Sequence, residues 1–241
     1  MEQPKTHRLV KTPQISARFL ADWMAASERK RRTIVRNCKY QPIGRVVQHN
    51  DAKLIVAKSI RDGNPDPVKL TAEAVSIRSK LADSDFDHDV NDHNADYIER
   101  FAKTCGNLHL PEADILAPGK AVALSVDGVR VTVELHFRLR RLTKTNKVRV
   151  GAGALRYTKG QALSVEVAEW HTAFLFGYLG EVGVEDGALP EHQLCLVVDA
   201  FAGAHHSAPT NAMSRFHNMK AACASISEQW PNIPPPPNAV L

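Results

Sequence analysis

The spacing of hydrophobic residues divides the chain into two parts. In the first part, apolar side chains recur every three to five residues, as at Ile15, Phe19 and Trp23, which is typical of one face of a helix. This pattern predicts a helix that begins near Ser16 and ends before Pro42. It also predicts helices at 43–60, 68–81 and 90–105, with a turn at 62–67 between the first two of these.

From about residue 120 onward, the hydrophobic period shortens to two, which is typical of half-buried strands. A strand at 121–126 is followed by Asp127 and Gly128, a pair that favours a tight hairpin turn. The alternating segment at 129–139 is then expected to form one strand with a basic outer face. A further strand at 148–157 has small residues at its centre, so another segment should pack closely against it.

The remaining elements complete an α/β fold. A helix at 165–179 precedes an apolar run at 194–201, which is typical of a central strand buried on both faces. That helix would be a crossover, so the strands at 148–157 and 194–201 are expected to be parallel. A last helix at 210–230 is followed by a proline-rich tail. The pattern predicts a small mixed sheet of about four strands with flanking helices, preceded by a helical N-terminal region.

We expect two domains, a helical basic region at 1–85 and an α/β core with the proline-rich tail at 86–241. The chain has 241 residues, of which 44% are hydrophobic, enough for a sizeable core. No apolar run is long enough to cross a membrane, and the N-terminus lacks the apolar segment of a secretory signal. The four cysteines form no closely spaced pair, so we expect reduced thiols in a cytoplasmic protein without a membrane partner.

Charge is distributed unevenly along the chain, whose formal net charge is +5. Residues 1–62 hold 14 Lys and Arg against 5 Asp and Glu, and residues 138–159 hold eight Lys and Arg with no acid. Such basic regions suit an anionic partner, and the alternative is a basic face that only meets solvent. The predicted contacts to nucleic acid are Arg29, Lys30, Arg31, Arg32, Arg138, Arg140, Arg141, Lys144, Lys147 and Arg149.

The region from about residue 88 to residue 230 includes the sequences VELHF at 133–137 and GAGALRY at 151–157. With these sequences, its order of elements resembles the core of the PD-(D/E)XK nuclease superfamily. The likeness is greatest to its RecB-like exonuclease branch. In that family, carboxylates on the second and third strands hold Mg²⁺, and a lysine positions the attacking water. The resemblance implies catalytic positions at Glu134, His136 and His171. The third strand lacks both the carboxylate and the lysine of the family's (Asp/Glu)-x-Lys motif.

A dense group of acids and histidines lies at 83–93. If a metal is bound, we expect Asp92, His93 and Glu134 to be its ligands. The alternative is that these acids stabilise the positive end of a helix dipole.

Together these features predict a DNA- or RNA-binding protein, alone or in a larger complex, whose nuclease-like core has lost its activity and needs no cofactor. One alternative is an active nuclease that uses Mg²⁺ or Mn²⁺ with Glu134, His136 and an acid from 87–99. The other alternative is a protein–protein adaptor whose basic faces bind acidic protein surfaces.

Overall fold

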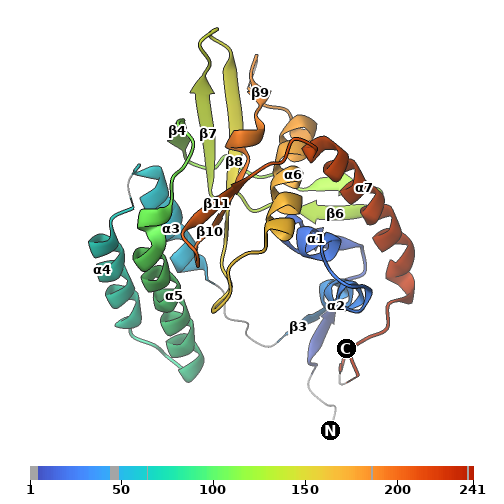
Figure 1. The fold of residues 1–241 in the computed structure, drawn as a ribbon. Helices are drawn as coiled ribbons and strands as arrows, with labels where there is room; N and C mark the ends of the chain where they lie inside the picture. The colour runs from blue at the N-terminus through green and yellow to red at the C-terminus, as the bar shows by residue number, and fades with distance from the viewer. Residues whose placement is uncertain (1–4, 44–48, 64, 186, 238) are drawn as a thin grey trace.

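The computed structural model describes residues 5–43, 49–63, 65–185, 187–237 and 239–241. Within these ranges the chain has an α/β fold with seven α-helices and three sheets, of six, three and two strands (Figure 1). Among the helices in the same ranges, none combines the length and the apolar character needed to cross a membrane.

The six-stranded sheet lies at the centre of the fold. Its members are β4 (Asp114–Leu116), β7 (Phe137–Leu142), β8 (Val148–Arg156), β9 (Leu189–Pro190), β10 (Leu196–Asp199) and β11 (Ala204–Ser207). The strand order is β11-β10-β8-β7-β4, and β9 pairs with β8 beside this path. As predicted, β10 is fully buried and runs parallel to β8, because α6 (Val165–Val182) forms the crossover between them.

Helices cover both faces of this sheet and form two lobes (Figure 1). The α5 lobe comprises α3 (Asn50–Arg61), α4 (Pro67–Arg78) and α5 (Asp85–Thr104). The α6 lobe comprises α1 (Ala17–Met24), α2 (Glu28–Lys39), α6 and α7 (Ala212–Gln229). Side chains alternate between the two lobes along β8, since Ala154 packs in the α6 lobe and Leu155 in the α5 lobe.

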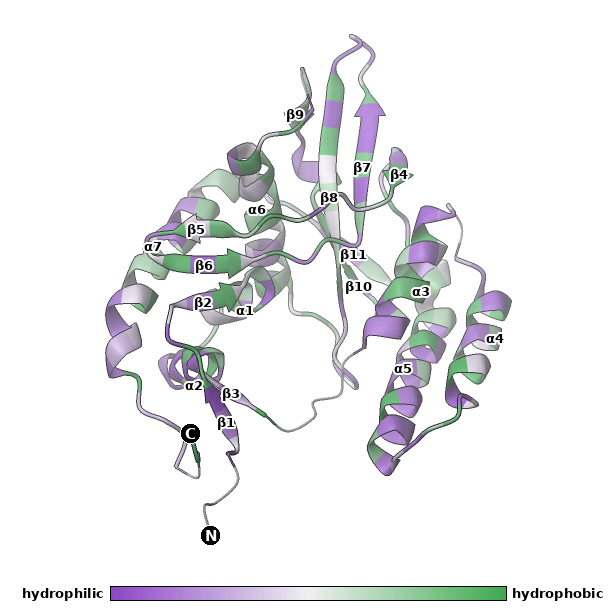
Figure 2. Ribbon diagram, turned by 180° about the vertical axis from the view of Figure 1, so that it is seen from behind, coloured by the Kyte–Doolittle hydropathy of each residue, from purple (hydrophilic) through white to green (hydrophobic). Residues whose placement is uncertain are grey.

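A three-stranded sheet of order β2-β6-β5 belongs to the α6 lobe (Figure 2). Its members are β2 (Gln14–Ser16), β5 (Leu124–Val126) and β6 (Val129–Thr132). The predicted hairpin between β5 and β6 is confirmed, with Asp127 (φ 45°) and Gly128 (φ 79°) in the left-handed conformation of its turn. The two-stranded sheet joins β1 (His7–Leu9) to β3 (Tyr40–Pro42).

The prediction of about four strands after a helical N-terminal region is wrong in both respects. The central sheet has six strands because the short strands β4, β9 and β11 extend it. The N-terminal region also contributes β1, β2 and β3, and β2 pairs in parallel with β6. Strands of two to four residues are too short to show an alternating pattern, so the sequence alone did not reveal them.

Two helix predictions also need correction. The helix expected from Ser16 to Pro42 is divided into α1 and α2, although Ser16 does cap the first of them by accepting the Phe19 N–H (3.2 Å). The expected helix at 43–60 falls partly on residues 44–48, which lie outside the described residues, and the described helix here is α3, which begins at Asn50.

The alternating segment at 129–139 does not form one strand. Val131 packs in the α6 lobe, whereas Phe137 and Leu139 pack in the α5 lobe. Residues at odd positions of one straight strand would share a face, so the chain must change faces between them. It does so at 133–136, a segment that belongs to neither sheet and that we call the crossing segment.

Small residues in β8 let neighbouring segments approach its backbone, as the sequence predicted. A Cβ atom added at Gly151 would collide with the backbone of Leu194, and one added at Gly153 would collide with the ring of Phe137. Phe137, the first residue of β7, is paired with Gly153 in the sheet, and its ring covers the Cα atom of this glycine. It therefore fixes the crossing segment against the end of β8.

Candidate functional site

The crossing segment places two polar side chains at the end of β8. The His136 N–H donates to Gly153 O (2.9 Å), and the Leu155 N–H donates to Nδ1 of His136 (3.2 Å). Because Nδ1 accepts a hydrogen bond, the proton of neutral His136 lies on Nε2. That nitrogen lies 3.5 Å from Oε1 of Glu134, so the histidine is oriented towards the carboxylate.

Glu134 also contacts Lys53 of α3. The Lys53 ammonium donates to both carboxylate oxygens, at 2.7 and 2.9 Å. Partial burial raises the pKa of Glu134, but the hydrogen bonds from His136 and Lys53 outweigh this effect and lower the pKa to about 2. Glu134 is therefore an ionised carboxylate near neutral pH, and its side chain remains 56% exposed.

His171 extends from α6 into the same region. It lines a cavity of about 270 Å³ together with Glu134, Arg18, Ser16, Phe19 and residues of the crossing segment and β8. Burial, with smaller contributions from the charges of Arg156 and Arg18, lowers the pKa of His171 well below its ordinary value. The structure thus brings together Glu134, His136 and His171, the three residues for which the sequence predicted catalytic positions.

A buried ion pair joins α1 to the same end of β8. Arg156 donates to Oδ1 of Asp22 (2.6 Å) and to the backbone oxygen of Arg18 (3.2 Å). The Arg156 side chain is only 7% exposed. Because α1 is held here, Arg18 lies close enough to contribute to the lowered pKa of His171, for which burial is the main cause.

Each of the three predicted metal ligands contacts a different set of residues. Asp92 on α5 is 3.4 Å from Nε of Arg78 and 3.5 Å from Nδ1 of its helix neighbour His88. The ring of His93 meets the ring of His49 edge-on, at 6.4 Å between centroids. Glu134 instead contacts Lys53 and His136. In the described ranges, no three His, Cys, Asp or Glu side chains are grouped so that they could hold a metal ion.

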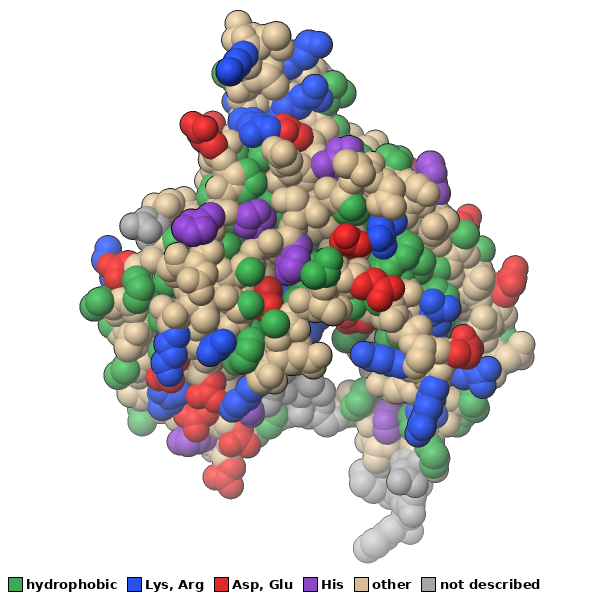
Figure 3. All heavy atoms as spheres, in the orientation of Figure 1, with side chains coloured by type: hydrophobic (Ala, Val, Ile, Leu, Met, Phe, Trp, Pro, Cys, Tyr) green, Lys and Arg blue, Asp and Glu red, His purple; other side chains and the backbone are tan. Residues whose placement is uncertain are grey.

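The basic residues of the β7–β8 hairpin differ in their contacts. Arg140 pairs with Glu185 (2.8 Å), Arg141 pairs with Glu191, and Arg138 donates to the backbone oxygen of Ala117 (3.2 Å). The exposed tip carries the remaining cations of the hairpin on a projecting ribbon, where Lys and Arg side chains gather at one end of the molecule (Figure 3). These remaining cations are Lys144, Lys147 and the half-buried Arg149.

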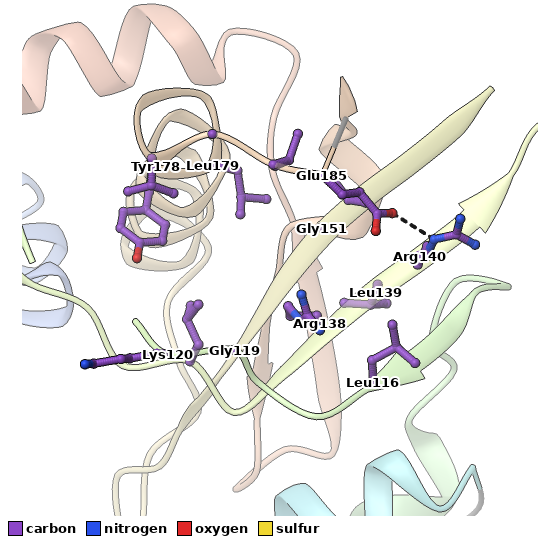
Figure 4. Close-up of a pocket in the computed structure, with 15 residues that line it drawn as sticks. Leu116, Gly119, Lys120, Arg138, Leu139, Arg140, Gly151, Tyr178, Leu179 and Glu185 are labelled. Atoms are coloured by element: carbon purple, nitrogen blue, oxygen red, sulfur yellow. Dashed lines mark hydrogen bonds and ion pairs between the residues drawn. The ribbon is translucent and has the colours of Figure 1, made fainter. Parts of the chain in front are cut away.

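On one side of β7, Arg140 reaches Glu185, which follows α6, and Arg138 lies against the loop that contains Ala117 and Gly119 (Figure 4). Here a cavity of about 190 Å³ lies between β7, the loop that contains Gly119 and Lys120, and the end of α6. Its floor includes Tyr178 and Leu179, and the Arg140–Glu185 ion pair closes one side. Positive charge on this side of β7 is therefore partly offset within the molecule.

The basic residues of α2 are less uniform than the sequence indicated. Arg29 and Lys30 are exposed, and Arg32 forms an exposed pair with Glu28 (3.1 Å). Arg31 is used within the fold, since it donates to the backbone oxygens of Trp23 and Met24 and lies 4.5 Å above the Trp23 ring. Arg29 and Lys30 are thus the two residues of this group that are best placed to meet a partner.

Several residues of the site were not predicted from the sequence, namely Arg18, Asp22, Lys53 and Arg156. Arg18 and Lys53 are isolated cations on helices, and nothing in their local pattern separates them from solvated surface residues. Arg156 is the one with a local signal, because it ends a strand in which nearly every other side chain is small or apolar.

No protein-family model matches this sequence, and no curated protein matches it either. The resemblance to PD-(D/E)XK nucleases therefore depends on the order of elements and on the strand sequences alone. What the site does must be inferred from its geometry and charge.

Proposed function

We propose that this chain is a nucleic-acid-binding protein that contacts the phosphate backbone through its β7–β8 hairpin. The observation that carries the proposal is the hairpin tip, where Lys144 and Lys147 are exposed on a projecting ribbon. From residue 138 to residue 159 the sequence contains no acid. Phosphate contacts provide most of the sequence-independent affinity of DNA- and RNA-binding proteins.

The core beneath the hairpin is proposed to be nuclease-like without retaining catalysis. Its third strand in the resemblance is β8, where GAGALR at 151–156 offers neither a carboxylate nor a lysine. Glu134 is the one carboxylate among the described residues that line the cavity, and it is already bonded to Lys53 and near His136. A protein with this arrangement would hold a strand without supplying the usual carboxylate pair for hydrolysis.

Binding of a fluorescent oligonucleotide at several salt concentrations tests the proposal. Each phosphate contact that is lost should reduce the slope of log affinity against log salt by about 0.9 for duplex DNA. The variant K144A/K147A should therefore lower the slope by about two units and weaken binding. The matched control K69A/K103A removes the same charge from exposed positions on the α5 lobe and should leave the slope unchanged.

An equal effect of both variants, or binding without any salt dependence, would contradict the proposal. Binding to an acidic protein with no affinity for oligonucleotides would favour the adaptor function instead.

The second candidate function is an active nuclease that uses Mg²⁺ or Mn²⁺. It is favoured by the ionised Glu134 carboxylate, which lines the same cavity as His171 and lies beside His136. Incubation of DNA and RNA with each metal, followed by electrophoresis, tests it. Cleavage by the wild type that disappears in Glu134→Gln would establish this function, and the absence of cleavage by wild-type protein would eliminate it under those conditions.

A further inference from the structure

Arg18 is a cation without a matching carboxylate. Its Nε is buried and has no hydrogen-bond partner, and in the described part of the chain no acid forms an ion pair with it. Two other cations of the region have a counter-charge, since Lys53 pairs with Glu134 and Arg156 pairs with Asp22. Arg18 as a whole is half-buried, but its Nε loses contact with water without gaining a partner, so an anion from outside the chain would stabilise this arrangement.

A second unpartnered polar group lies on the wall of the same cavity. His171 is 4% exposed, and its Nδ1 has no hydrogen-bond partner. Both Arg18 and His171 line the cavity of about 270 Å³, which also reaches Ser16 at the N-terminus of α1. The guanidinium and a protonated imidazole nitrogen are both hydrogen-bond donors, and donors of this kind bind the oxygens of phosphate groups.

Two more unpartnered groups belong to residues whose pKa the charge of Arg18 affects. Nδ1 of His49 and the hydroxyl of Tyr97 are buried without partners. Burial is the main reason that the pKa of His49 is lowered, and the charge of Arg18 contributes to the lowering. Four of the unpartnered buried polar atoms in the described chain therefore belong to Arg18 or to residues whose pKa is affected by its charge.

The cavity size restricts the ligand. A volume of about 270 Å³ is slightly below the usual range of about 300–1,000 Å³ for ligand pockets. A cavity of this size suits a phosphate group with part of its sugar better than a continuous strand of several nucleotides. Glu134 in the same wall does not repel the anion strongly, because Lys53 offsets its charge.

We propose that Arg18 and His171 bind a phosphoryl group in this cavity, and that its source is the terminal phosphate of a nucleic-acid strand. The choice of a strand end rests on the proposed nucleic-acid binding, whereas the phosphoryl chemistry follows from the cavity itself. In this arrangement the hairpin holds the strand's backbone, and the cavity receives its end.

The test compares one oligonucleotide with a 5′-phosphate, with a 3′-phosphate and with neither, by fluorescence anisotropy. Wild-type protein should bind one of the phosphorylated forms about 10- to 100-fold more tightly than the unphosphorylated form, the effect of one or two charge-assisted hydrogen bonds. Inorganic phosphate should compete for this difference and raise the melting temperature of the protein. Arg18→Gln and His171→Asn should each remove most of the difference.

Arg36→Gln is the matched control, because the Nε of Arg36 is also buried without a partner but lies on α2 and does not line the cavity. This variant should keep the preference for the phosphorylated strand. Melting curves of every variant show whether it is folded, and the phosphate competition with wild-type protein needs no variant.

The outcomes distinguish the phosphoryl site from the proposed nucleic-acid binding. Equal affinity for all three oligonucleotides, together with no effect of inorganic phosphate, would overturn it. Stabilisation by inorganic phosphate that depends on Arg18, without binding of any oligonucleotide, would support the phosphoryl site while eliminating the proposed nucleic-acid binding. Loss of the preference in Arg36→Gln as well would show that it does not arise in this cavity.

Discussion

Asp22 completes the buried ion pair that holds α1 against the end of β8, and the substitution Asp22→Ala should measure how strongly it does so. In this variant Arg156, whose side chain is 7% exposed, would lose its counter-charge and retain only the bond to the backbone of Arg18. Breaking a buried ion pair from one side typically costs about 3–5 kcal/mol.

The Asp22 side chain is 22% exposed, so water can partly solvate the cation that is left behind. We therefore expect the free energy of unfolding to fall by about 2–3 kcal/mol, at or just below the lower limit of this range. With a urea dependence of about 2–3 kcal/mol per molar, the unfolding midpoint should fall by about 1 M. Urea titration followed by circular dichroism measures this change.

Two further variants show whether the lost charge pair is the cause. Glu28→Ala removes the exposed pair with Arg32 on the neighbouring helix and should change stability by no more than about 0.5 kcal/mol. The double variant Asp22→Leu/Arg156→Met leaves no charge unpaired and should be more stable than Asp22→Ala. A loss in Asp22→Ala as small as that in Glu28→Ala would refute the reasoning.

Other predictions concern the packing, titration and reactivity of named side chains. Gly153→Ala should lower the free energy of unfolding by about 1–3 kcal/mol, because its methyl group would collide with the Phe137 ring. Gly180→Ala, which places its methyl group in open space, should not destabilise the protein, and urea titration measures both variants. Lys53→Met should raise the pKa of Glu134 from about 2 towards its ordinary value of 4.5, as followed by carboxyl NMR, and an unchanged pKa would contradict the ion pair. Since the folded pKa of Glu134 is the lower one, its stabilisation should be complete above about pH 4.5 and lost as the pH falls to about 2, so the wild type and Glu134→Gln should converge in melting temperature at that pH. Thiol reagents should label the folded protein slowly and the unfolded protein quickly, because burial raises the pKa of every cysteine: Cys38, Cys105, Cys195 and Cys223.

The elements that the sequence predicted well are those with a strong local signal. The Asp127-Gly128 turn, the buried strand β10 and the parallel crossover between β8 and β10 are each marked by composition over a few residues. The helices α4 to α7 have caps or periodic apolar positions within their own segments. Such signals depend on short-range sterics and hydrogen bonding, which a single sequence contains.

What the sequence did not reveal depends on partners far along the chain. The segment at 129–139 alternates without interruption, and only the distribution of Val131 and Phe137 between the two lobes shows that it changes faces. Alternation specifies which side chains share a face of a strand, but it does not specify the sheet that the strand joins. The site has the same property, because Arg156 contacts Arg18, which is 138 residues away, and Lys53 contacts Glu134, which is 81 residues away.

The change of faces also explains why the candidate site lies where it does. A continuous strand through 129–139 would direct Glu134 and His136 to one solvated face. Their backbone groups would then pair with a neighbouring strand, and their side chains would bond to water. Because the crossing segment leaves both sheets, His136 accepts the Leu155 N–H through its ring, which no strand ladder provides. Its ring is thereby fixed beside Glu134 at the cavity that Arg18 lines. The polar cluster is thus a direct consequence of where the chain passes from one lobe to the other.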